Sequence, residues 1–352
     1  MRPGLVCCGF GEYSDSAMTY LLAFAVAFFV VLLTTPVVRI LARKTRFLDI
    51  PSNRKSHRWP TPLLGGLSVL VGFMCAAGAA IYVLREPVSA RLLGFLGGGL
   101  LVFLIGLVDD RVGLSPATKL AGQLAAGLLL LLSGNTNGLI TNGWMDISLS
   151  LVWVVGLVNA FNFLDNMDGV SSGIAFIAGL AFVVVAALNG QVLTAALAAA
   201  LAGASLAFLR FNFNPASIFL GDAGAMFLGY VMAALALMST WHQSSHLFLL
   251  VPIVILAYPI FDISLVTLIR YREGRGIAQA GRDHSSHRLA SLVAAPRGAV
   301  LLIYAFCGVL GVGGILVGFY LTITSALIVV APVTFGLLWL GVRLSHVPVH
   351  RS

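Results

Sequence analysis

Charged side chains are scarce in this chain of 352 residues: Asp, Glu, Lys and Arg together make up 10% of it, and only 13 residues are acidic. Soluble domains carry about 25% charged residues, so this composition excludes an ordinary water-soluble protein. Hydrophobic residues make up 59% of the chain, and its mean hydropathy is +0.99. The chain is therefore predicted to use the lipid bilayer as its solvent.

Cysteine is also rare, and the four cysteines show no metal-ligand spacing. Cys75 and Cys307 lie in apolar runs, where cysteine is ordinarily a small buried hydrophobe, so no disulfide framework is expected. The segment before Met18 has no apolar core of its own and does not match a cleavable signal. The formal net charge of +8 would indicate nucleic acid in a soluble protein, but in a membrane protein such charge mostly orients the loops. No nucleic-acid partner is expected.

The chain does contain long apolar runs, and about eleven of them are expected to be membrane helices because a bilayer core needs about 20 apolar residues. Their predicted limits are 18–38, 63–84, 92–108, 117–133, 147–163, 170–187, 193–209, 223–239, 247–269, 298–318 and 322–342. The predicted fold is all-α, a polytopic membrane helix bundle of 10–11 transmembrane helices.

We expect a single integral membrane domain over residues 1–352, with a short extracytoplasmic segment at 1–17. The positive charges predict its orientation. With the N-terminus outside, all of the 21 Lys and Arg residues except Arg2, Arg85 and Arg91 fall in or beside inner segments. An excess of Lys and Arg marks cytoplasmic loops. The prediction is therefore an N-out, C-in multi-pass protein of the cell (inner) membrane, with cytoplasmic active-site loops at 39–62 and 270–297.

With this orientation the acidic residues collect on the inner side, whereas the outer side has only four, scattered singly. The inner clusters close different apolar runs, so that a helix bundle could bring them together: Asp109–Asp110, Asp165 with Asp168, Asp222, and Asp283. Carboxylates that converge at a membrane surface indicate a divalent metal and a phosphorylated substrate. The sequence therefore favours an enzyme.

Asp109 and Asp110 are adjacent, and adjacent carboxylates repel unless a cation or a proton relieves them. One interpretation is a helix end that pairs with Arg111. The other is a metal or phosphate site in which one carboxylate acts as a base.

Residues 159–169 hold the densest polar motif. Asn159, Asn162 and Asp165 or Asn166 recur at spacings of three and four, which places them on one helix face, and Gly169 permits a turn that a ligand can approach closely. Such polar groups beside apolar spans are costly and functional by default. Polar contacts between helices are the alternative interpretation.

Asp222 begins another apolar run, close to two glycines. It could cap that helix and could also bind a metal, because hard cations such as Mg²⁺ prefer oxygen ligands. We take Asp222 as the first candidate for direct metal contact. Phe219 offers an aromatic face for stacking, and Asn214 lies in the same loop.

Two basic loops complete the predicted site, the first with Lys55 and His57 and the second around residues 282–288. Orientation of the loops explains many of these charges, but it does not need histidine, so His284 and His287 are candidates for phosphate contact. The two histidines with Asp283 could bind zinc, although no third soft ligand lies nearby.

Asp262 lies inside an apolar run, about two turns from its end. An acid within the membrane is a functional candidate by default. The alternative is a buried structural partner of an Asn or Arg.

Five motifs occur in order between Asn53 and Arg288: Lys-x-His-x-x-Pro-Thr-Pro-x-x-Gly-Gly, Asp-Asp, Asn-x-x-Asn-x-x-Asp-x-x-Asp-Gly, Phe-Leu-Gly-Asp-Ala-Gly and the late His loop. Together they resemble the polyprenyl-phosphate N-acetylhexosamine-1-phosphate transferases, the family of the MraY, WecA and TagO types. The resemblance implies transfer of a sugar-1-phosphate from a UDP-N-acetylhexosamine to a membrane polyprenyl phosphate, with release of UMP. It also implies Mg²⁺ as the cofactor, for which Mn²⁺ could substitute.

The resemblance also implies roles for residues. Asp222 resembles the metal ligand, with Asp165 beside it, and Phe219 resembles the face that stacks on uracil. Asp109, the candidate base, and Asp110 resemble the pair near the lipid phosphate, and Asp165 and Asp168 resemble catalytic carboxylates of the nucleotide site. The implied substrate contacts are Lys55, His57, Asn159, Asn162, Asn166, Gly169, Asn214, Phe219, Arg282, His284, His287 and Arg288.

The late loop departs from the family, because Ser286 stands where another histidine is expected. This departure favours N-acetylglucosamine as the sugar over the muramoyl-pentapeptide donor of MraY-type enzymes, which stays the alternative. An ion-coupled secondary transporter is an alternative of another class, although transporter acids usually lie near the membrane midplane within inverted repeats. A CDP-alcohol phosphotransferase should carry Asp-Gly-x-x-Ala-Arg, which is missing. The sequence leaves the oligomeric state open, a homodimer included.

Overall fold

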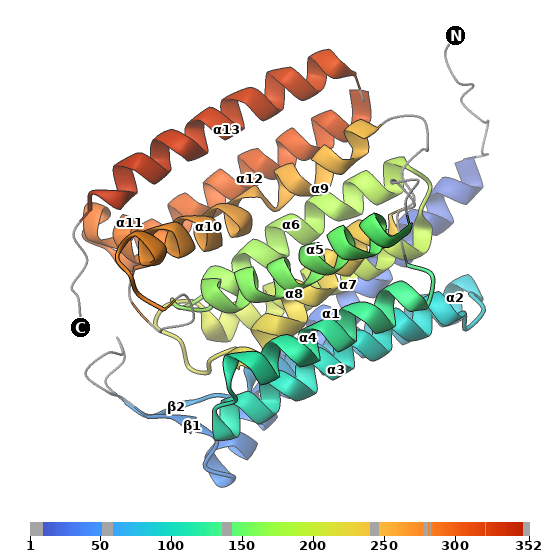
Figure 1. Cartoon of the computed structure of the whole chain (residues 1–352). Helices are drawn as coiled ribbons and strands as arrows, with labels where there is room; N and C mark the ends of the chain where they lie inside the picture. Colours follow the sequence, from blue (N-terminus) through green and yellow to red (C-terminus); the bar gives the residue numbers. More distant parts are fainter. Residues whose placement is uncertain are drawn as a thin grey trace.

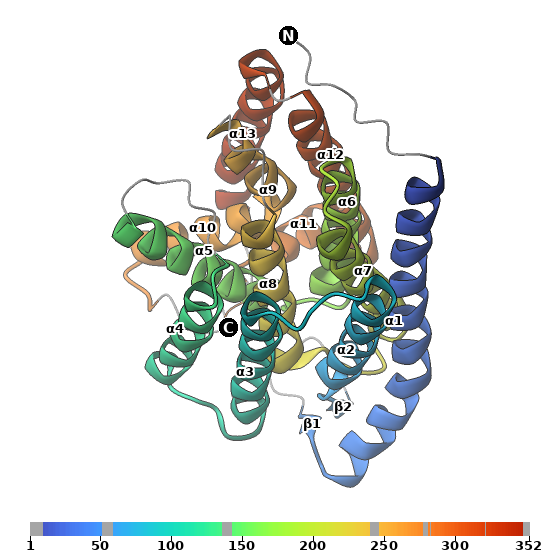
Figure 2. The same ribbon diagram turned by 90° about the vertical axis from the view of Figure 1, so that its right-hand side faces the viewer.

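The computed structural model describes residues 10–50, 59–135, 143–239, 246–276, 281, 283–320 and 322–347. Within these ranges the chain is a bundle of helices that run side by side, and the only sheet is a two-stranded hairpin (Figures 1 and 2). The all-α, polytopic prediction is confirmed. The elements are α1 Phe10–Lys44, β1 Leu48–Asp49, β2 Thr61–Pro62, α2 Gly65–Leu84, α3 Ala90–Val112, α4 Pro116–Leu132, α5 Gly143–Leu164, α6 Val170–Leu188, α7 Val192–Asn212, α8 Gly221–Met238, the 3-10 helix η1 His246–Leu249, α9 Leu250–Ile255, α10 Ala257–Arg272, α11 Ser285–Val293, α12 Pro296–Tyr320 and α13 Ile323–Ser345.

Each of the eleven predicted apolar runs lies on helix, and in the described part of the chain nine helices are long and apolar enough to cross a membrane. The other two predicted runs differ from simple spans. Helix α4 is only 17 residues long. The run at 247–269 is divided into η1, α9 and α10, with a break at Leu256. Pro259 explains the break, because proline lacks the N–H that would bond to the carbonyl of Ile255 and its ring clashes with that carbonyl.

Helix α8 forms the centre of the bundle, and nearly all of its residues are buried. It packs against α3, α5 and α2, while α7 packs against α1 and α6. Small residues permit these close contacts, as is common between membrane helices. A Cβ on Gly229 of α8 would lie 2.6 Å from the carbonyl oxygen of Leu157 in α5. In contrast, α13 lies at the edge, and almost none of its residues are fully buried (Figure 1).

The first turn of α8 is held by backbone contacts with the start of α2. The N–H of Gly65 donates to the carbonyl of Phe219 at 2.9 Å, and that of Gly66 donates to Leu220 at 2.8 Å. A Cβ on Gly66 would lie 2.4 Å from the Cα of Gly224, so only glycine allows this approach. The hairpin leads directly into this contact, since the N–H of Phe219 donates to the carbonyl of Pro62 in β2.

The α5–α6 turn is tied to the α7–α8 loop by Asn212, which is buried at the end of α7. Its side-chain oxygen accepts from the N–H of Gly169 at 3.1 Å and from the hydroxyl of Ser172 at 3.2 Å, and its amide donates to the carbonyl of Ile218. Gly169 has a φ of +82°, a conformation that favours glycine. These contacts place residues 165–169 beside the loop that leads into α8.

Candidate active site

Three backbone N–H groups at the start of α8 are the centre around which the predicted acids gather. Asp110, near the end of α3, accepts from the N–H of Asp222 at 2.9 Å and from that of Ala223 at 3.1 Å. Asp165, just after α5, accepts from the N–H of Gly221. The first turn of a helix has N–H groups without partners inside the helix and a partial positive charge. The carboxylates of Asp110 and Asp165 therefore hold the start of α8 in place, and with it the third carboxylate of the cluster, that of Asp222.

Lys119 of α4 joins the two remaining acids of this cluster. Its ammonium group forms ion pairs with Asp109 of α3 and with Asp222, the latter at 2.8 Å. Asp109 also accepts from the N–H of Leu114 at 2.6 Å. Lys119 was predicted only as an orienting charge. Its position one turn into an apolar helix could have identified it as functional, since such a charge is costly within a membrane.

Arg111, the alternative partner for the Asp109–Asp110 pair, lies elsewhere. Its guanidinium carbon stands 5.6 Å from the ring centre of Phe47, and it donates to the carbonyl of Arg46 at 3.5 Å. The simple interpretation of a helix end paired with Arg111 is therefore wrong, because the pair makes its contacts with α4 and α8.

The cluster holds more negative charge than Lys119 can neutralise. Burial, followed by the nearby carboxylates of Asp222, Asp110 and Asp168, raises the pKa of Asp165 well above its ordinary value. Each of these causes disfavours a further negative charge. The site is therefore electrostatically prepared for an additional cation.

The donor set suits a hard divalent cation. No three His, Cys, Asp or Glu side chains within the described ranges form a ready-made metal site. Mg²⁺, however, is commonly bound by one or two carboxylates and completes its shell with water and substrate phosphates. Asp165 and Asp222 supply oxygens of this kind next to the negative charge just described. Their role as metal ligands stays a prediction.

Asp168 and Asn214, predicted from different motifs, meet in the structure. One oxygen of Asp168 accepts from the Asn214 amide at 2.9 Å and from the N–H of Ala216 at 3.0 Å. The carbonyl of Asn214 accepts in turn from Arg297 of α12. These contacts close the α7–α8 loop onto the α5–α6 turn. The second oxygen of Asp168 has no hydrogen bond to the described residues.

The two asparagines of α5 have different surroundings. The amide of Asn159 donates to Gln123 of α4 at 2.7 Å, which matches the polar contact between helices that was the alternative interpretation. In contrast, the amide nitrogen of Asn162 is buried and has no hydrogen-bond partner in the described part of the chain. Of the two asparagines, Asn162 is therefore the one whose amide N–H can donate to a ligand.

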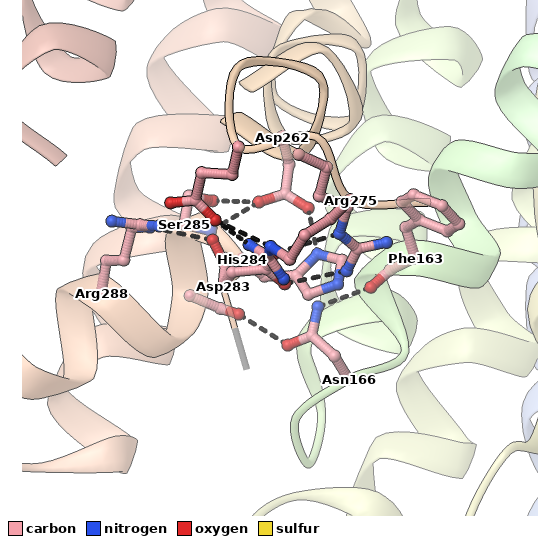
Figure 3. A network of polar contacts seen from close by, with 11 residues as sticks. Phe163, Asn166, Asp262, Arg275, Asp283, His284, Ser285 and Arg288 are labelled. Atoms are coloured by element: carbon pink, nitrogen blue, oxygen red, sulfur yellow. Dashed lines mark hydrogen bonds and ion pairs between the residues drawn. The ribbon is translucent and has the colours of Figure 1, made fainter. Parts of the chain in front are cut away.

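The late loop reaches the site through α11, a short helix that was not predicted. Asn166, in the α5–α6 turn, accepts from the hydroxyl of Ser286 at 2.6 Å (Figure 3). The ring centres of His284 and His287 lie 6.5 Å apart, and the ring of His284 makes a T-shaped contact with that of Phe163 in α5. The structure therefore brings both predicted histidines beside the turn that carries Asp165 and Asp168.

The buried acids around α11 have specific partners. Asp262 of α10 contacts His284 and Ser285, and not the Asn or Arg that was the alternative (Figure 3). Asp283 forms a two-pronged ion pair with Arg270, at 3.0 and 2.8 Å, and also pairs with Arg275. Burial opposes ionisation of Asp283, but the hydrogen bonds and charge of Arg270 hold its pKa well below the ordinary value.

Arg288 was predicted to contact substrate, and the structure places it against backbone. Its guanidinium donates at 2.9 Å to the carbonyls of Asp283, Leu344 and Val347. It therefore fastens α11 to the end of α13. Phe219 is partly buried, and its backbone pairs with the start of α2 as described above. Lys55, His57 and Arg282 lie outside the described residues.

An apolar groove of about 540 Å³ opens on the side of the bundle between α5, α8, α9 and α10. It extends along α5 from Asp146 to Ala160, and Ile260 and Ile263 of α10 line it opposite. Ala160 precedes Asp165 by five residues, which is about 7.5 Å along a helix axis. The groove therefore approaches the acid cluster along α5.

The chain is similar to a known protein family and to several of its members. A model of glycosyl transferase family 4 matches residues 92–240. The chain is 33% identical over 293 residues to a probable undecaprenyl-phosphate N-acetylglucosaminyl 1-phosphate transferase of Bacillus subtilis, and the match covers 80% of each chain. It is 31% identical over 315 residues to a decaprenyl-phosphate N-acetylglucosaminephosphotransferase of Mycobacterium tuberculosis, covering 78% of this chain and 77% of the relative. A phospho-N-acetylmuramoyl-pentapeptide-transferase of Heliobacterium modesticaldum is 38% identical over 196 residues, 51% of this chain and 61% of the relative.

Proposed function

The chain belongs to the polyprenyl-phosphate N-acetylhexosamine-1-phosphate transferases, and we propose that it moves N-acetylglucosamine-1-phosphate from UDP-N-acetylglucosamine to a polyprenyl phosphate such as undecaprenyl phosphate. The product is a lipid-diphosphate sugar that starts the synthesis of a cell-envelope glycan, and UMP is released. One observation carries the proposal: acids from α3, α5 and α8 meet with Lys119 at one end of a membrane helix bundle.

The coverage of the relatives favours N-acetylglucosamine over a muramoyl-pentapeptide. The two relatives named for N-acetylglucosamine match at least 78% of this chain, whereas the muramoyl-pentapeptide transferase matches 51%. Ser286 supports the same choice. In the structure it is buried and hydrogen-bonded to Asn166, so a small hydroxyl fills a position where the resemblance implies a histidine.

The reaction exchanges one phosphoanhydride bond for another. An oxygen of the polyprenyl phosphate attacks the β-phosphorus of the donor, and the bond from that phosphorus to the bridging oxygen breaks with release of UMP. No ATP is needed. Both reactants are anions, so catalysis depends mainly on positioning and on neutralising charge.

The residues of the site suit that task. Lys119 provides a cation where α3, α4 and α8 meet, and Asp109 is the candidate base beside it. Asp165 and Asp222 would hold Mg²⁺, which supplies Lewis-acid stabilisation of phosphate oxygens when bound. The free amide of Asn162 and the second oxygen of Asp168 are available for the nucleotide sugar. Lys55, His284 and His287 stay the predicted contacts of the diphosphate and sugar.

The groove beside α5 supports a lipid acceptor. Its walls are almost entirely apolar side chains, as a polyprenyl chain requires. It approaches the acid cluster along α5, so a lipid lying in it could present its phosphate at the helix ends. The predicted excess of Lys and Arg on the side of the acids supports a cytoplasmic site in the inner membrane.

The test is incubation of the purified protein with polyprenyl phosphate, Mg²⁺ and a panel of UDP-sugars, following UMP release and the lipid product. We expect activity with UDP-N-acetylglucosamine that requires both the lipid and the metal. A transporter would instead show counterflow uptake in vesicles with no lipid-linked product, and that result would refute the proposal. If the UDP-muramoyl-pentapeptide were the only donor that supported turnover, it would replace UDP-N-acetylglucosamine as the assigned donor.

A further inference from the structure

Asp262 is fully buried in α10, yet it is a carboxylate with three hydrogen-bonding contacts to the start of α11 and its cap. One oxygen lies 2.9 Å from Nδ1 of His284. The other accepts from the N–H of Ser285 at 2.8 Å and from its hydroxyl at 2.5 Å. The Tyr258 hydroxyl, also buried, lies 2.8 Å from that of Ser285. The proposed reaction gives His284 a substrate contact but no role to Asp262, Ser285 or Tyr258.

We propose that Asp262 is a positioning residue that holds His284 with its proton on Nδ1 and so turns Nε2 toward the substrate. The identity of that substrate, a nucleotide sugar, rests on the proposed function. The contacts around the His284 ring do not depend on the proposed function.

The chemistry of the contact fixes which nitrogen carries the proton. An ionised carboxylate only accepts hydrogen bonds, so Nδ1 must be the donor. In the neutral ring Nε2 is then an acceptor, and in the charged ring it is a second donor. Among the described residues no group hydrogen-bonds to Nε2, which leaves that atom for a ligand. A carboxylate that orients an imidazole in this way is common where histidine acts as a ligand or an acid–base group.

Packing also fixes the plane of the ring. The rings of His284 and Phe163 form a T-shaped contact with their centres 5.6 Å apart, and the guanidinium of Arg270 stands 5.5 Å from the centre of the same phenyl ring. Arg270 is held by Asp283. The charged and titratable groups around His284 are thus Asp262 and Arg270 from α10, Asp283 and Arg275 from the loop between the helices, and His287 from α11.

The fixed ring adjoins the acid cluster. The hydroxyl of Ser286 donates to Asn166, which immediately follows Asp165. Phe163, which contacts the ring, lies two residues before Asp165 on the same segment of chain. His284 is therefore anchored on both sides to the turn that bears the predicted catalytic carboxylates.

A purely structural role for Asp262 is the alternative, because it also accepts the N–H of the first residue of α11. The two roles differ in a double-mutant cycle. Asp262→Asn keeps an acceptor for Ser285 but replaces the carboxylate at Nδ1 by an amide. We would measure kcat and KM for the nucleotide sugar in wild type, Asp262→Asn, His284→Gln and the double variant. Tyr258→Phe serves as the control, since it changes the same buried network but leaves the Asp262–His284 contact intact.

We expect Asp262→Asn to lower kcat by about 10–100-fold, the usual cost of losing such an orienting partner, with KM changed less than about threefold. The double variant should then be no slower than His284→Gln, because Asp262 acts only through that ring. Tyr258→Phe should stay within about threefold of wild type. Fully additive losses in the double variant would overturn the proposal, and so would unchanged kcat in Asp262→Asn.

A spectroscopic measurement tests the same pair without any substrate. In protein labelled with ¹⁵N-histidine, the signals of His284 are identified by their loss in His284→Gln. We expect a protonated Nδ1 in wild type and transfer of the proton to Nε2 in Asp262→Asn, since an amide N–H can donate to Nδ1. An unprotonated Nδ1 in wild type would refute the proposal. If no UDP-sugar supports transfer, the proposed function fails, while this spectrum still decides whether Asp262 orients His284.

Discussion

Asp110, Asp165 and Asp262 are carboxylates that accept backbone N–H groups from the first turn of another helix. Asp110 and Asp165 do so at α8, and Asp262 does so at α11. A carboxylate at a helix N-terminus satisfies free donors and complements the helix dipole. In each case the helix start carries a predicted functional side chain, Asp222 or His284. These acids therefore build the site as well as supply charge to it.

Asp222 is the acid at which α3, α4 and α8 converge, so its charge is the sharpest single test of the site. We expect Asp222→Asn to reduce metal-dependent transfer by at least about 100-fold, the scale found when one group that stabilises the transition state is lost. The fold should persist, because Asp222 is capped through its backbone and not through its side chain. Transfer is measured as UMP release, and folding is measured by thermal unfolding in detergent.

Glu86→Gln is the matched control, since it neutralises an exposed acid at the other ends of the helices. It should keep wild-type turnover. Full activity of Asp222→Asn would remove this residue from the metal site.

Lys119 is the counter-ion of Asp109 and Asp222 in the metal-free protein, so it competes with a metal for the same negative charge. We expect Lys119→Gln to bind Mn²⁺ about tenfold more tightly in the absence of substrate, and to lose most transfer activity because the anionic substrates lose a cation. Mn²⁺ binding is followed by electron paramagnetic resonance. Lys44→Gln, which removes an exposed lysine at the end of α1, should leave Mn²⁺ binding unchanged. Equal Mn²⁺ affinity in Lys119→Gln and wild type would contradict the competition.

The raised pKa of Asp165 predicts how stability depends on pH in the metal-free protein. Burial and the nearby carboxylates raise it well above the ordinary value of 3.8, so the folded protein keeps this proton at pH values where the unfolded chain has lost it. Stability from this residue is therefore greatest at low pH and falls as pH rises above about 4 toward the folded-state pKa. Asp165→Asn cannot lose a proton.

We accordingly expect the melting temperature of Asp165→Asn to exceed that of wild type in EDTA, by a margin that grows between pH 5.5 and pH 8. Differential scanning fluorimetry in detergent measures it. A margin that shrinks with rising pH would show that Asp165 is not held in an anionic, buried setting.

At the scale of elements, the start of α8 is held in place by close backbone contact with α2 and α3. A Cβ on Gly66 would lie 2.4 Å from the Cα of Gly224, and one on Gly106 would lie 2.5 Å from the Cα of Ala223. Backbone atoms cannot move aside as a flexible side chain can. Any added atom at Gly66 must therefore displace the turn that carries Asp222.

We expect Gly66→Ala to lower stability by about 1–3 kcal/mol, the usual cost of overpacking, and to lower transfer more than tenfold. Gly78→Ala is the control on the same helix, because a Cβ there meets nothing within 4 Å. It should unfold at or slightly above the wild-type temperature, since alanine favours helix over glycine. Thermal unfolding and UMP release measure the two effects. A Gly66→Ala protein that matches Gly78→Ala in both would show that the contact is not required.

The apolar runs could be predicted because length and hydropathy alone determine a membrane helix, and each of them lies on helix. The break at Leu256 was missed, although Pro259 marked its place. Helix α11 was missed because its nine residues, beginning Ser-Ser-His, are too few and too polar for a span. Their helical form depends on acceptors supplied by Asp262 and by the end of α13, which are remote in sequence.

For the site as a whole, the sequence predicted that the inner acids converge, because the acidic clusters of α3, the α5–α6 turn and α8 lie at the same end of the bundle. It could not predict the pairings, which depend on how helices pack. Lys119 reaches Asp222 across 103 positions, and Ser286 reaches Asn166 across 120. For the same reason Asn159 was assigned to substrate although Gln123 occupies its amide. Side chains that face each other across a helix bundle leave no local pattern in the sequence.

The orientation of the whole molecule follows from its loops, because the bundle itself has no preference for either side of a membrane. Glu273 follows α10 at the end where the acids meet, and Glu86 follows α2 at the opposite end. The excess of Lys and Arg near Glu273 predicts that this end faces the cytoplasm. In a variant without native cysteines, we expect Glu86→Cys to react with a membrane-impermeant maleimide on intact cells, and Glu273→Cys to react only after permeabilisation. The reverse pattern would place the acid cluster outside the cell, away from any cytoplasmic supply of nucleotide sugar, and the proposed reaction would have no donor.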